Sequence, residues 1–287
     1  MRKYIFSFIA ILLIIFPEFI VNSEEDSLMK VHFIDVGQGD SILVQTPGKK
    51  NILIDGGSPK AGQKVVAYLN NLQIKKLDLL IATHPDIDHI GGLPHVMKSI
   101  KVNKIIDSGK FYTTKTYFKY MNQIKQDKIP LKTAIKGEHI YIDPSLQIKV
   151  LNTYERRKNN NQSSIVLKIT YDDIDFLLMG DVEKEQEKEL GEEFHLEADI
   201  VKIAHHGSRT SSSLKFLEEV NPKIALITYS KKNKYGHPVQ RVIENLNNIN
   251  ALIYSTAVFG DIIIQTDGQN FFIIPEKSPI DGLLKIS

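Results

Sequence analysis

Cysteine is absent from this chain of 287 residues. Its absence excludes a disulfide framework, a cysteine nucleophile, a thiolate metal site and a lipid-modified cysteine near the N-terminus. An excess of one charge is also missing, because 36 basic residues oppose 34 acidic ones. The chain therefore lacks the strong field of a nucleic-acid packaging protein, and any anionic substrate must be held by local groups. Low-complexity linkers are lacking too, so we expect one catalytic domain over residues 30–275 and a C-terminal tail over 276–287.

The one long apolar stretch lies at the start of the chain. Arg2 and Lys3 precede an apolar run over residues 4–16, which Pro17 ends. This run has the length of a signal-peptide core and is shorter than the roughly 20 residues that span a bilayer. Residues 1–23 are therefore predicted to be a signal peptide of a secreted or extracellular protein. If they are not cleaved, they would anchor the domain outside the membrane, and only then do we expect membrane contact.

Short β-branched runs alternate with helical patterns along the rest of the chain. The predicted strands cover residues 31–36, 41–46, 51–55, 77–83, 165–171, 176–179, 199–204 and 224–229, and the predicted helices cover 60–73, 183–194 and 214–220. This order indicates an α/β fold of two similar halves, each a mixed sheet with helices outside. The charged and amide-rich run over residues 155–162 is predicted to be an exposed loop between the halves.

Four possible metal ligands follow the buried strand predicted over residues 77–83. They are His84, Asp86, Asp88 and His89, and Gly91 and Gly92 come directly after them. A loop at the carboxyl end of a strand can direct two of these side chains to each side, which is what two adjacent metal ions require.

Three further strand ends carry similar residues. Asp181 follows one strand, and its two oxygens could each bind one of two ions. His205 and His206 follow another, and could supply one metal ligand and one imidazole that contacts substrate. Asp55 ends a third strand and is predicted to orient a metal-binding histidine.

Other residues suit substrate binding. Ser208 comes shortly before a predicted helix, where hydroxyls and backbone amides bind an anion or simply cap the helix. His237 lies in a lysine-containing loop and could give a proton to a leaving oxygen or bind a phosphate. Aromatic residues on another predicted helix could stack on bases, although packing is the commoner role of such residues; they are Phe111, Tyr112, Tyr117, Phe118 and Tyr120.

An ordered set of motifs resembles the metallo-β-lactamase superfamily and, within it, the hydrolase domain of the ComEC competence proteins. The matching stretches are residues 33–40 (FIDVGQGD), 53–57 (LIDGG), 84–92 (HPDIDHIGG), 161–164 (NQSS), 180–181 (GD), 205–208 (HHGS) and 235–238 (YGHP). The resemblance implies an αββα sandwich with a metal site at one edge and a hydrolase that uses one or two divalent metal ions. It covers the hydrolase domain alone, so we expect a stand-alone exported relative, and a role in DNA uptake does not follow.

The resemblance also assigns roles to individual residues. His84 and Asp86 resemble ligands of the first metal, Asp88 and His89 resemble ligands of the second, and Asp181 resembles the bridge. His206 is the preferred further ligand of the second metal, with His205 beside it. Asp86 stands where many members have a second histidine, and Asn161 stands near the place of a third. The first site is thus richer in oxygen, which favours a harder ion such as manganese over zinc, or a weakly held first metal.

These observations predict an exported metal-dependent hydrolase, either a phosphodiesterase or a nuclease, that uses a metal-activated water oriented by Asp88. Its expected partner is a phosphodiester, with DNA among the candidates. His205 and His237 are the other predicted catalytic residues, and Ser208 is predicted to bind substrate. Three alternatives keep the metals and change the substrate to a wall polymer, a phosphocholine ester, or a lactam or lactone. A non-catalytic binding module is the alternative from another class.

Overall fold

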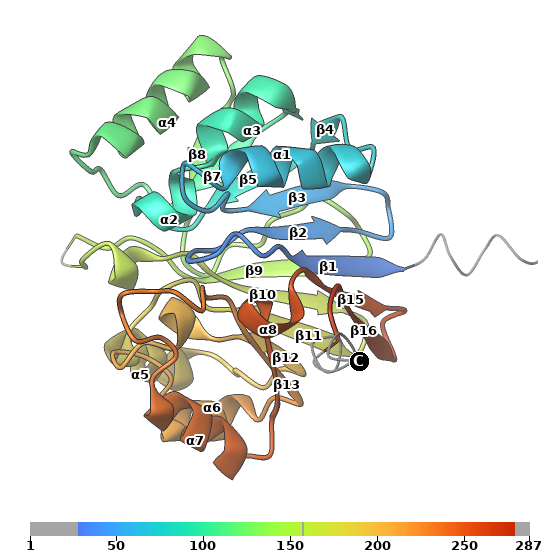
Figure 1. Ribbon diagram of the computed structural model, residues 1–287, viewed down its shortest axis with the longest axis vertical. Coiled ribbons are helices and arrows are strands. Elements are labelled where there is room, and N and C mark those ends of the chain that lie inside the picture. The colour runs from blue at the N-terminus through green and yellow to red at the C-terminus, as the bar shows by residue number, and fades with distance from the viewer. Residues whose placement is uncertain (1–27, 157, 279–287) are drawn as a thin grey trace, which may run out of the picture.

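Two β-sheets lie face to face in the computed structural model, which describes residues 28–156 and 158–278 (Figure 1). The first sheet has the order β16-β15-β1-β2-β3-β5-β7-β8 and consists of β1 (Met29–Phe33), β2 (Ile42–Gln45), β3 (Asn51–Ile54), β5 (Leu79–Ala82), β7 (Ile105–Asp107), β8 (Leu131–Thr133), β15 (Ile262–Thr266) and β16 (Phe271–Pro275). The second has the order β14-β13-β12-β11-β10-β9 and consists of β9 (Gln147–Asn152), β10 (Val166–Tyr171), β11 (Ile174–Leu178), β12 (Ile200–Lys202), β13 (Ile224–Ile227) and β14 (Leu252–Ser255). Two short strands, β4 (Lys76–Leu77) and β6 (Lys101–Val102), pair separately.

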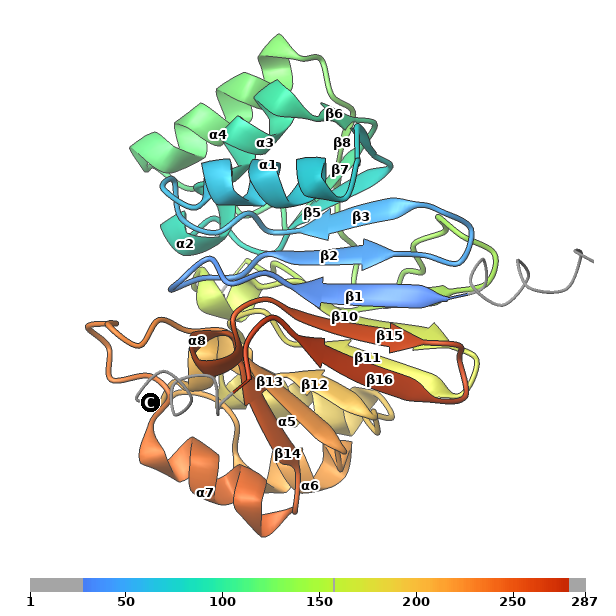
Figure 2. The same ribbon diagram turned by 45° about the vertical axis from the view of Figure 1, so that its right-hand side comes forward.

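Helices cover the outer face of each sheet (Figures 1 and 2). The helices are α1 (Gly62–Asn71), α2 (Ile87–Ile90), α3 (Leu93–Ser99), α4 (Lys115–Gln126), α5 (Lys184–Glu193), α6 (Leu214–Val220), α7 (Gln240–Asn248) and α8 (Thr256–Phe259). The first sheet carries α1, α3 and α4, and the second carries α5, α6 and α7, each over its own buried apolar cluster. The αββα sandwich expected from the sequence is therefore confirmed.

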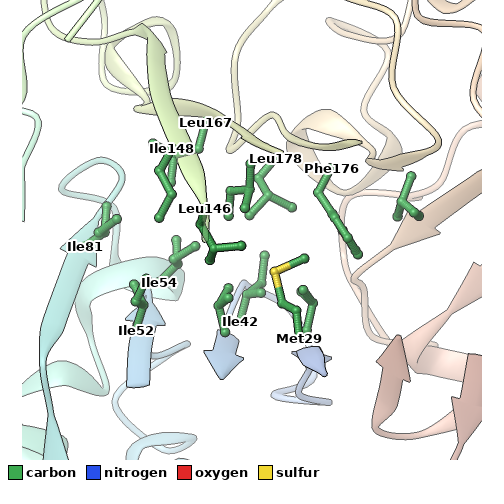
Figure 3. Packing of buried hydrophobic residues seen from close by; sticks show 14 of the residues in the cluster. Met29, Ile42, Ile52, Ile54, Ile81, Leu146, Ile148, Leu167, Phe176 and Leu178 are labelled. Atoms are coloured by element: carbon green, nitrogen blue, oxygen red, sulfur yellow. The ribbon is translucent and has the colours of Figure 1, made fainter. Parts of the chain in front are cut away.

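The largest apolar cluster fills the space between the two sheets (Figure 3). Successive side chains of a strand point to opposite faces of its sheet. Met29, Val31 and Phe33 of β1 therefore enter this cluster, whereas His32 faces the helical layer and hydrogen-bonds Tyr68 of α1 at 2.8 Å. The strands are thus held on both faces, which fixes the positions of the loops at their ends.

The loops that carry the candidate ligands leave one edge of the sandwich. β3 and β5 are parallel neighbours, and β11, β12 and β13 are parallel to one another. Since the carboxyl ends of parallel strands meet at one edge, Asp55 after β3 comes close to His84 after β5. Asp181 after β11 and His206 after β12 come together in the second sheet for the same reason. A hydrogen bond from the Ile165 amide to the Thr83 carbonyl, 2.9 Å long, joins the two groups of loops.

The division into halves differs from the prediction. β9 already belongs to the second sheet although it precedes residues 155–162, and β15 returns to pair with β1 in the first. The predicted loop is not wholly exposed either, because Lys158 is buried and its ammonium group donates to Asn152 at 2.8 Å. A long lysine stem can be buried where its charged end finds a polar partner, which the charged composition did not reveal.

Two of the predictions concern residues that the structure does not describe. The signal peptide or anchor expected over residues 1–23 lies outside the described residues, as do residues 279–287 of the expected tail. Within the described ranges, no helix combines the length and the apolar character needed to cross a membrane.

Candidate metal centre

Two histidines from the first sheet present one ring nitrogen each to the same space. The Nδ1 of buried His84 lies 3.1 Å from the Thr83 hydroxyl and 3.2 Å from that of Ser164. His89, from α2, donates from Nδ1 to the carboxylate of Asp55 at 2.8 Å. The Nε2 atoms of both rings are buried and have no hydrogen-bond partner among the described residues. Hydrogen bonds at Nδ1 therefore leave the Nε2 lone pairs available to a metal ion.

Asp55 holds His89 in place. Its carboxylate also accepts the Thr83 amide at 2.8 Å and the Thr83 hydroxyl at 2.6 Å. Burial raises the pKa of Asp55, although the His89 charge and these hydrogen bonds act in the opposite direction. Asp55 thus occupies the position expected of a group that orients a ligating histidine.

The second sheet contributes His205 and His206 through a strained turn. Both residues adopt left-handed backbone angles, with φ of 50° and 55°. Such angles cost roughly 1 kcal/mol or more for residues other than glycine, and are found where the surrounding structure fixes them. The His206 Nδ1 donates to the Thr228 carbonyl at 2.8 Å, and its Nε2 has no partner among the described residues. The turn thus directs a third free Nε2 into the site.

Asp181 lies at the centre of the group. Its Oδ2 is 3.3 Å from the Nε2 of His89, 3.5 Å from that of His206, 3.8 Å from that of His205 and 3.9 Å from that of His84. Two ligand atoms that each lie about 2.1 Å from one tetrahedral ion are about 3.4 Å apart. The observed spacing therefore matches that of ligands around shared cations.

The other oxygen of Asp181 points away from the histidine nitrogens. Its Oδ1 lies 3.9 Å from the Nζ of Lys202 and has no hydrogen-bond partner among the described residues. The buried ammonium group attracts this oxygen and leaves Oδ2 toward the histidines.

Lys202 and Asp40 form a buried ion pair that sequence reasoning missed. The Lys202 side chain is fully buried, contacts the Asp40 carboxylate and donates to the Gly180 carbonyl at 3.2 Å. Asp40 also accepts the Thr228 hydroxyl at 2.5 Å and lies 3.6 Å from Nδ1 of His206. The signal that could have found this pair is a lysine inside an otherwise apolar strand, because a buried charge needs a partner.

Asp86 and Asp88 flank the cluster on its more open side. The Asp86 carboxylate lies 3.7 Å from Nε2 of His84, and the Asp88 carboxylate lies 3.7 Å from Nε2 of His206. Asn160, the neighbour of the predicted ligand Asn161, contacts Asp86, donating from its amide at 2.6 Å. Asn161 begins the 3₁₀ turn over Asn161–Ser163, and its role as a metal ligand stays a prediction.

The predicted substrate residues differ in their positions. The rings of His237 and His205 are 5.5 Å apart, and the buried Nδ1 of His237 has no partner among the described residues. Ser208 does not fit its predicted role, because it is buried and its hydroxyl accepts the amide of Thr210 within its own turn at 3.3 Å.

Of the two roles predicted for the serines before α6, an anion site and a helix cap, the structure shows the cap, because the Ser213 hydroxyl accepts the Phe216 amide at 3.4 Å. The amides of Ser212 and Ser213 donate to the carboxylate of Glu187, in the latter case at 2.9 Å. The protein's own side chain therefore takes the place that an external anion would occupy.

Charge and burial oppose each other in the centre. Burial, reinforced by His89, lowers the pKa of His84 to about 3. Burial also acts to lower the pKa of His89 and His206, but nearby carboxylates, Asp181 foremost, outweigh it and raise both values. Burial acts to raise the pKa of Asp181, and the surrounding histidines more than reverse this. The carboxylates therefore favour positive charge at His89 and His206, the positions where cations would bind.

The donor set fits divalent metal ions. Among the described residues, three groups each have ligand atoms within 4.8 Å of one another: His84, His89 and Asp181; Asp88, His89 and His206; and Asp40, Asp55 and His89. Mixed imidazole and carboxylate ligands suit zinc, manganese and iron. A profile of the metallo-beta-lactamase superfamily matches residues 34–230, well over half of the chain and all of these ligands.

The chain belongs to the metallo-β-lactamase superfamily. It is a hydrolase of the metallo-β-lactamase fold, as the sequence predicted, and it resembles proteins of the ComEC type. ComE operon protein 3 of Bacillus subtilis is 32% identical over 252 residues, which are 81% of this chain and 32% of that protein. Recombination protein 2 of Haemophilus influenzae is 27% identical over 269 residues, 91% of this chain and 31% of that protein. The chain thus spans about a third of the length of these relatives.

A solved structure supports the same fold. The metallo-beta-lactamase fold protein YhfI of Bacillus subtilis superposes with a TM-score of 0.57 at 14% sequence identity, covering 83% of this chain and 99% of that one. At this identity the likeness concerns the superfamily fold alone.

Proposed function

We propose that this metallo-β-lactamase-fold hydrolase is a metal-dependent phosphodiesterase that cleaves nucleic acid outside the cell. The observation that carries the proposal is the convergence of four Nε2 atoms, those of His84, His89, His205 and His206, on one carboxylate oxygen of Asp181. Three of those nitrogens are buried without a hydrogen-bond partner among the described residues, and a cation would satisfy them.

Two sites share the central carboxylate in this proposal. His84 and Asp86 would hold one ion, Asp88, His89 and His206 would hold the other, and Asp181 would be a ligand available to both. Manganese or zinc suits the mixture of imidazole and carboxylate ligands. When bound, such ions lower the pKa of a water molecule and neutralise negative charge on an attacked phosphodiester.

Residues at the open side would act on the substrate. Asp88, half-buried beside His206, is placed to accept a hydrogen bond from the attacking water. Burial, together with His205 and His206, lowers the pKa of His237 to about 4, so the ring is neutral at pH 7. A neutral imidazole still has one N–H group, with which His237 would donate a hydrogen bond to a phosphoryl or leaving oxygen. His205, which is partly exposed, would bind the same phosphoryl or leaving oxygen from the side opposite His237.

Two observations support the rest of the proposal. The match to a relative named as a recombination protein supports nucleic acid as the phosphodiester. The signal-peptide pattern over residues 1–23 supports export, with anchoring to the outer side of the membrane if that segment is retained.

A substrate panel tests the proposal. Protein stripped by a chelator and reloaded with Mn²⁺ or Zn²⁺ would be incubated with bis(4-nitrophenyl) phosphate, single-stranded DNA, teichoic acid, a phosphocholine ester and nitrocefin. We expect hydrolysis of the first two and none by the stripped protein. Hydrolysis confined to nitrocefin, to the phosphocholine ester or to teichoic acid would overturn the proposal.

A further inference from the structure

An acid-free segment of the chain is rich in aromatic residues and lysines. Residues 108–126, which comprise the approach to α4 and the helix itself, contain five aromatic residues and four lysines but no aspartate or glutamate. Lys115 and Lys119 are exposed, and within the described residues neither pairs with a carboxylate. The segment therefore presents a local positive charge that the nearly neutral whole chain conceals.

Three aromatic rings gather on this segment. Phe111 lies 5.6 Å from Tyr117 and 6.5 Å from Phe118, and the Tyr117 and Phe118 rings are 6.3 Å apart, all edge to face. Phe111 is 64% exposed and Phe118 48%, whereas Tyr120 is buried in the core. Packing in the core therefore explains the position of Tyr120, but the rings of Phe111 and Phe118 remain exposed to water. We call Phe111, Tyr117, Phe118, Lys115 and Lys119 the aromatic surface.

The aromatic surface adjoins the metal centre. A small pocket beside His84 is also lined by Pro85, Lys110 and Tyr117, and Tyr117 is the ring that both exposed phenylalanines contact. α4 also packs against α2, which carries Asp88, and lies above it in Figure 1. A chain of phosphodiesters bound on the surface would therefore lead toward the candidate ligands.

We propose that the aromatic surface binds single-stranded nucleic acid, with Phe111 and Phe118 stacking on bases and Lys115 and Lys119 pairing with phosphates. This inference rests on the proposed function, because the bound strand is the substrate of the adjacent centre. Every base offers a flat face for stacking whatever its sequence, whereas the bases of a duplex already stack on one another. The surface therefore selects single strands without selecting a sequence.

Binding to metal-free protein tests the inference separately from catalysis. The probe is fluorescein-labelled dodecathymidylate, followed by fluorescence anisotropy in the presence of a chelator. The double variant Phe111→Ala, Phe118→Ala should bind at least tenfold more weakly, since alanine substitution at one stacking ring weakens binding by about five- to hundredfold. Phe272→Ala is the matched control, because Phe272 is 66% exposed on β16, far along the first sheet, and this variant should bind like the wild type.

One further probe and one further variant separate stacking from charge. An abasic dodecamer has the same phosphates without bases, so the wild type should prefer dodecathymidylate to it, and the double phenylalanine variant should lose this preference. The variant Lys115→Gln, Lys119→Gln should retain the preference. For this lysine variant, the slope of log Kd against log salt concentration should fall by about 1.4, because each of the two lost phosphate contacts contributes about 0.7.

Clear outcomes would overturn the inference. Unchanged affinity and unchanged base preference in the double phenylalanine variant would refute it. The inference would also be refuted if the double phenylalanine variant retained oligonucleotide binding but no longer bound vesicles of phosphatidylglycerol and phosphatidylcholine. The aromatic surface would then be a membrane-binding surface. A wild type that binds as expected but hydrolyses no phosphodiester refutes the proposed function alone. Hydrolysis of bis(4-nitrophenyl) phosphate together with base-independent binding refutes this inference alone.

Discussion

Replacement of Lys202 by methionine removes a buried charge beneath the metal centre and nearly preserves the side-chain volume. The Lys202 side chain is fully buried, and its partner Asp40 is only 3% exposed. Without the ammonium group, Asp40 retains the Thr228 hydroxyl and the Nδ1 atoms of His206 and His89, at 3.6 and 4.0 Å, but loses its permanently charged partner. Breaking a buried pair by removing one member costs about 3–5 kcal/mol. For the roughly 250 residues that fold here, this lowers Tm by about 6–10 °C.

The assay is urea unfolding of chelated protein, followed by circular dichroism, so that metal binding does not add to stability. The double variant Lys202→Met, Asp40→Asn removes both charges and should recover at least about 2 kcal/mol of the loss. The deficit of the single variant should also shrink as the pH falls, because Asp40 can then take up a proton. The ion-pair account is wrong if Lys202→Met unfolds within about 1 kcal/mol of the wild type and the double variant is no more stable than the single one.

Other predictions concern single residues. Asp55→Asn should weaken metal binding by about ten- to a hundredfold without unfolding the protein, because His89 loses the carboxylate that orients it. Competition with a chromogenic chelator measures the metal affinity. An unchanged affinity would show that Asp55 does not act through His89. Burial lowers the pKa of His32 to about 4 in the folded protein. As the pH falls from 6.5 to 4, the unfolded chain therefore takes up a proton at His32 before the folded protein does. The free energy of unfolding should fall by up to about 3 kcal/mol over this range. His32→Gln should remove this part of the acid loss, and an identical fall in the urea midpoint of both proteins would contradict it. Ser208→Ala should leave turnover of bis(4-nitrophenyl) phosphate within about threefold, since the hydroxyl is engaged in its own turn; a hundredfold fall in kcat/KM would restore its predicted role.

The sequence was most informative where strands end in polar residues. The ligand candidates could be found because a buried apolar run fixes the strand, and parallel strands bring their carboxyl ends to one edge. His84, His89, Asp181 and His206 were predicted in this way, and the structure brings their side chains within a few ångströms of one another. The layers of the fold followed from the same alternation of strands and helices.

Other features depend on tertiary contacts that no local pattern reveals. The apolar strand around Lys202 signals that this lysine needs a partner, but only the packing of the two sheets shows that the partner is Asp40. The contact of Asn160 with Asp86 joins two loops 74 residues apart, and the orientation of Asp181 depends on the position of Lys202. The return of β15 to β1 is a pairing across more than 200 residues, which periodicity cannot indicate. Sequence patterns thus located the site, but the partners that orient its side chains came from packing.

The metal content of Asp181→Asn, compared with that of the wild type by elemental analysis, tests the central claim most directly. Asparagine has nearly the size of aspartate and suits turns, but it removes the negative charge on which the histidine nitrogens converge. The wild type should carry between one and two equivalents of manganese, zinc or a similar ion. The folded variant should lose at least one equivalent, and its activity should fall about a hundredfold, the scale of losing one charge-stabilising group. A folded Asp181→Asn protein with the metal content of the wild type would contradict the shared-carboxylate centre.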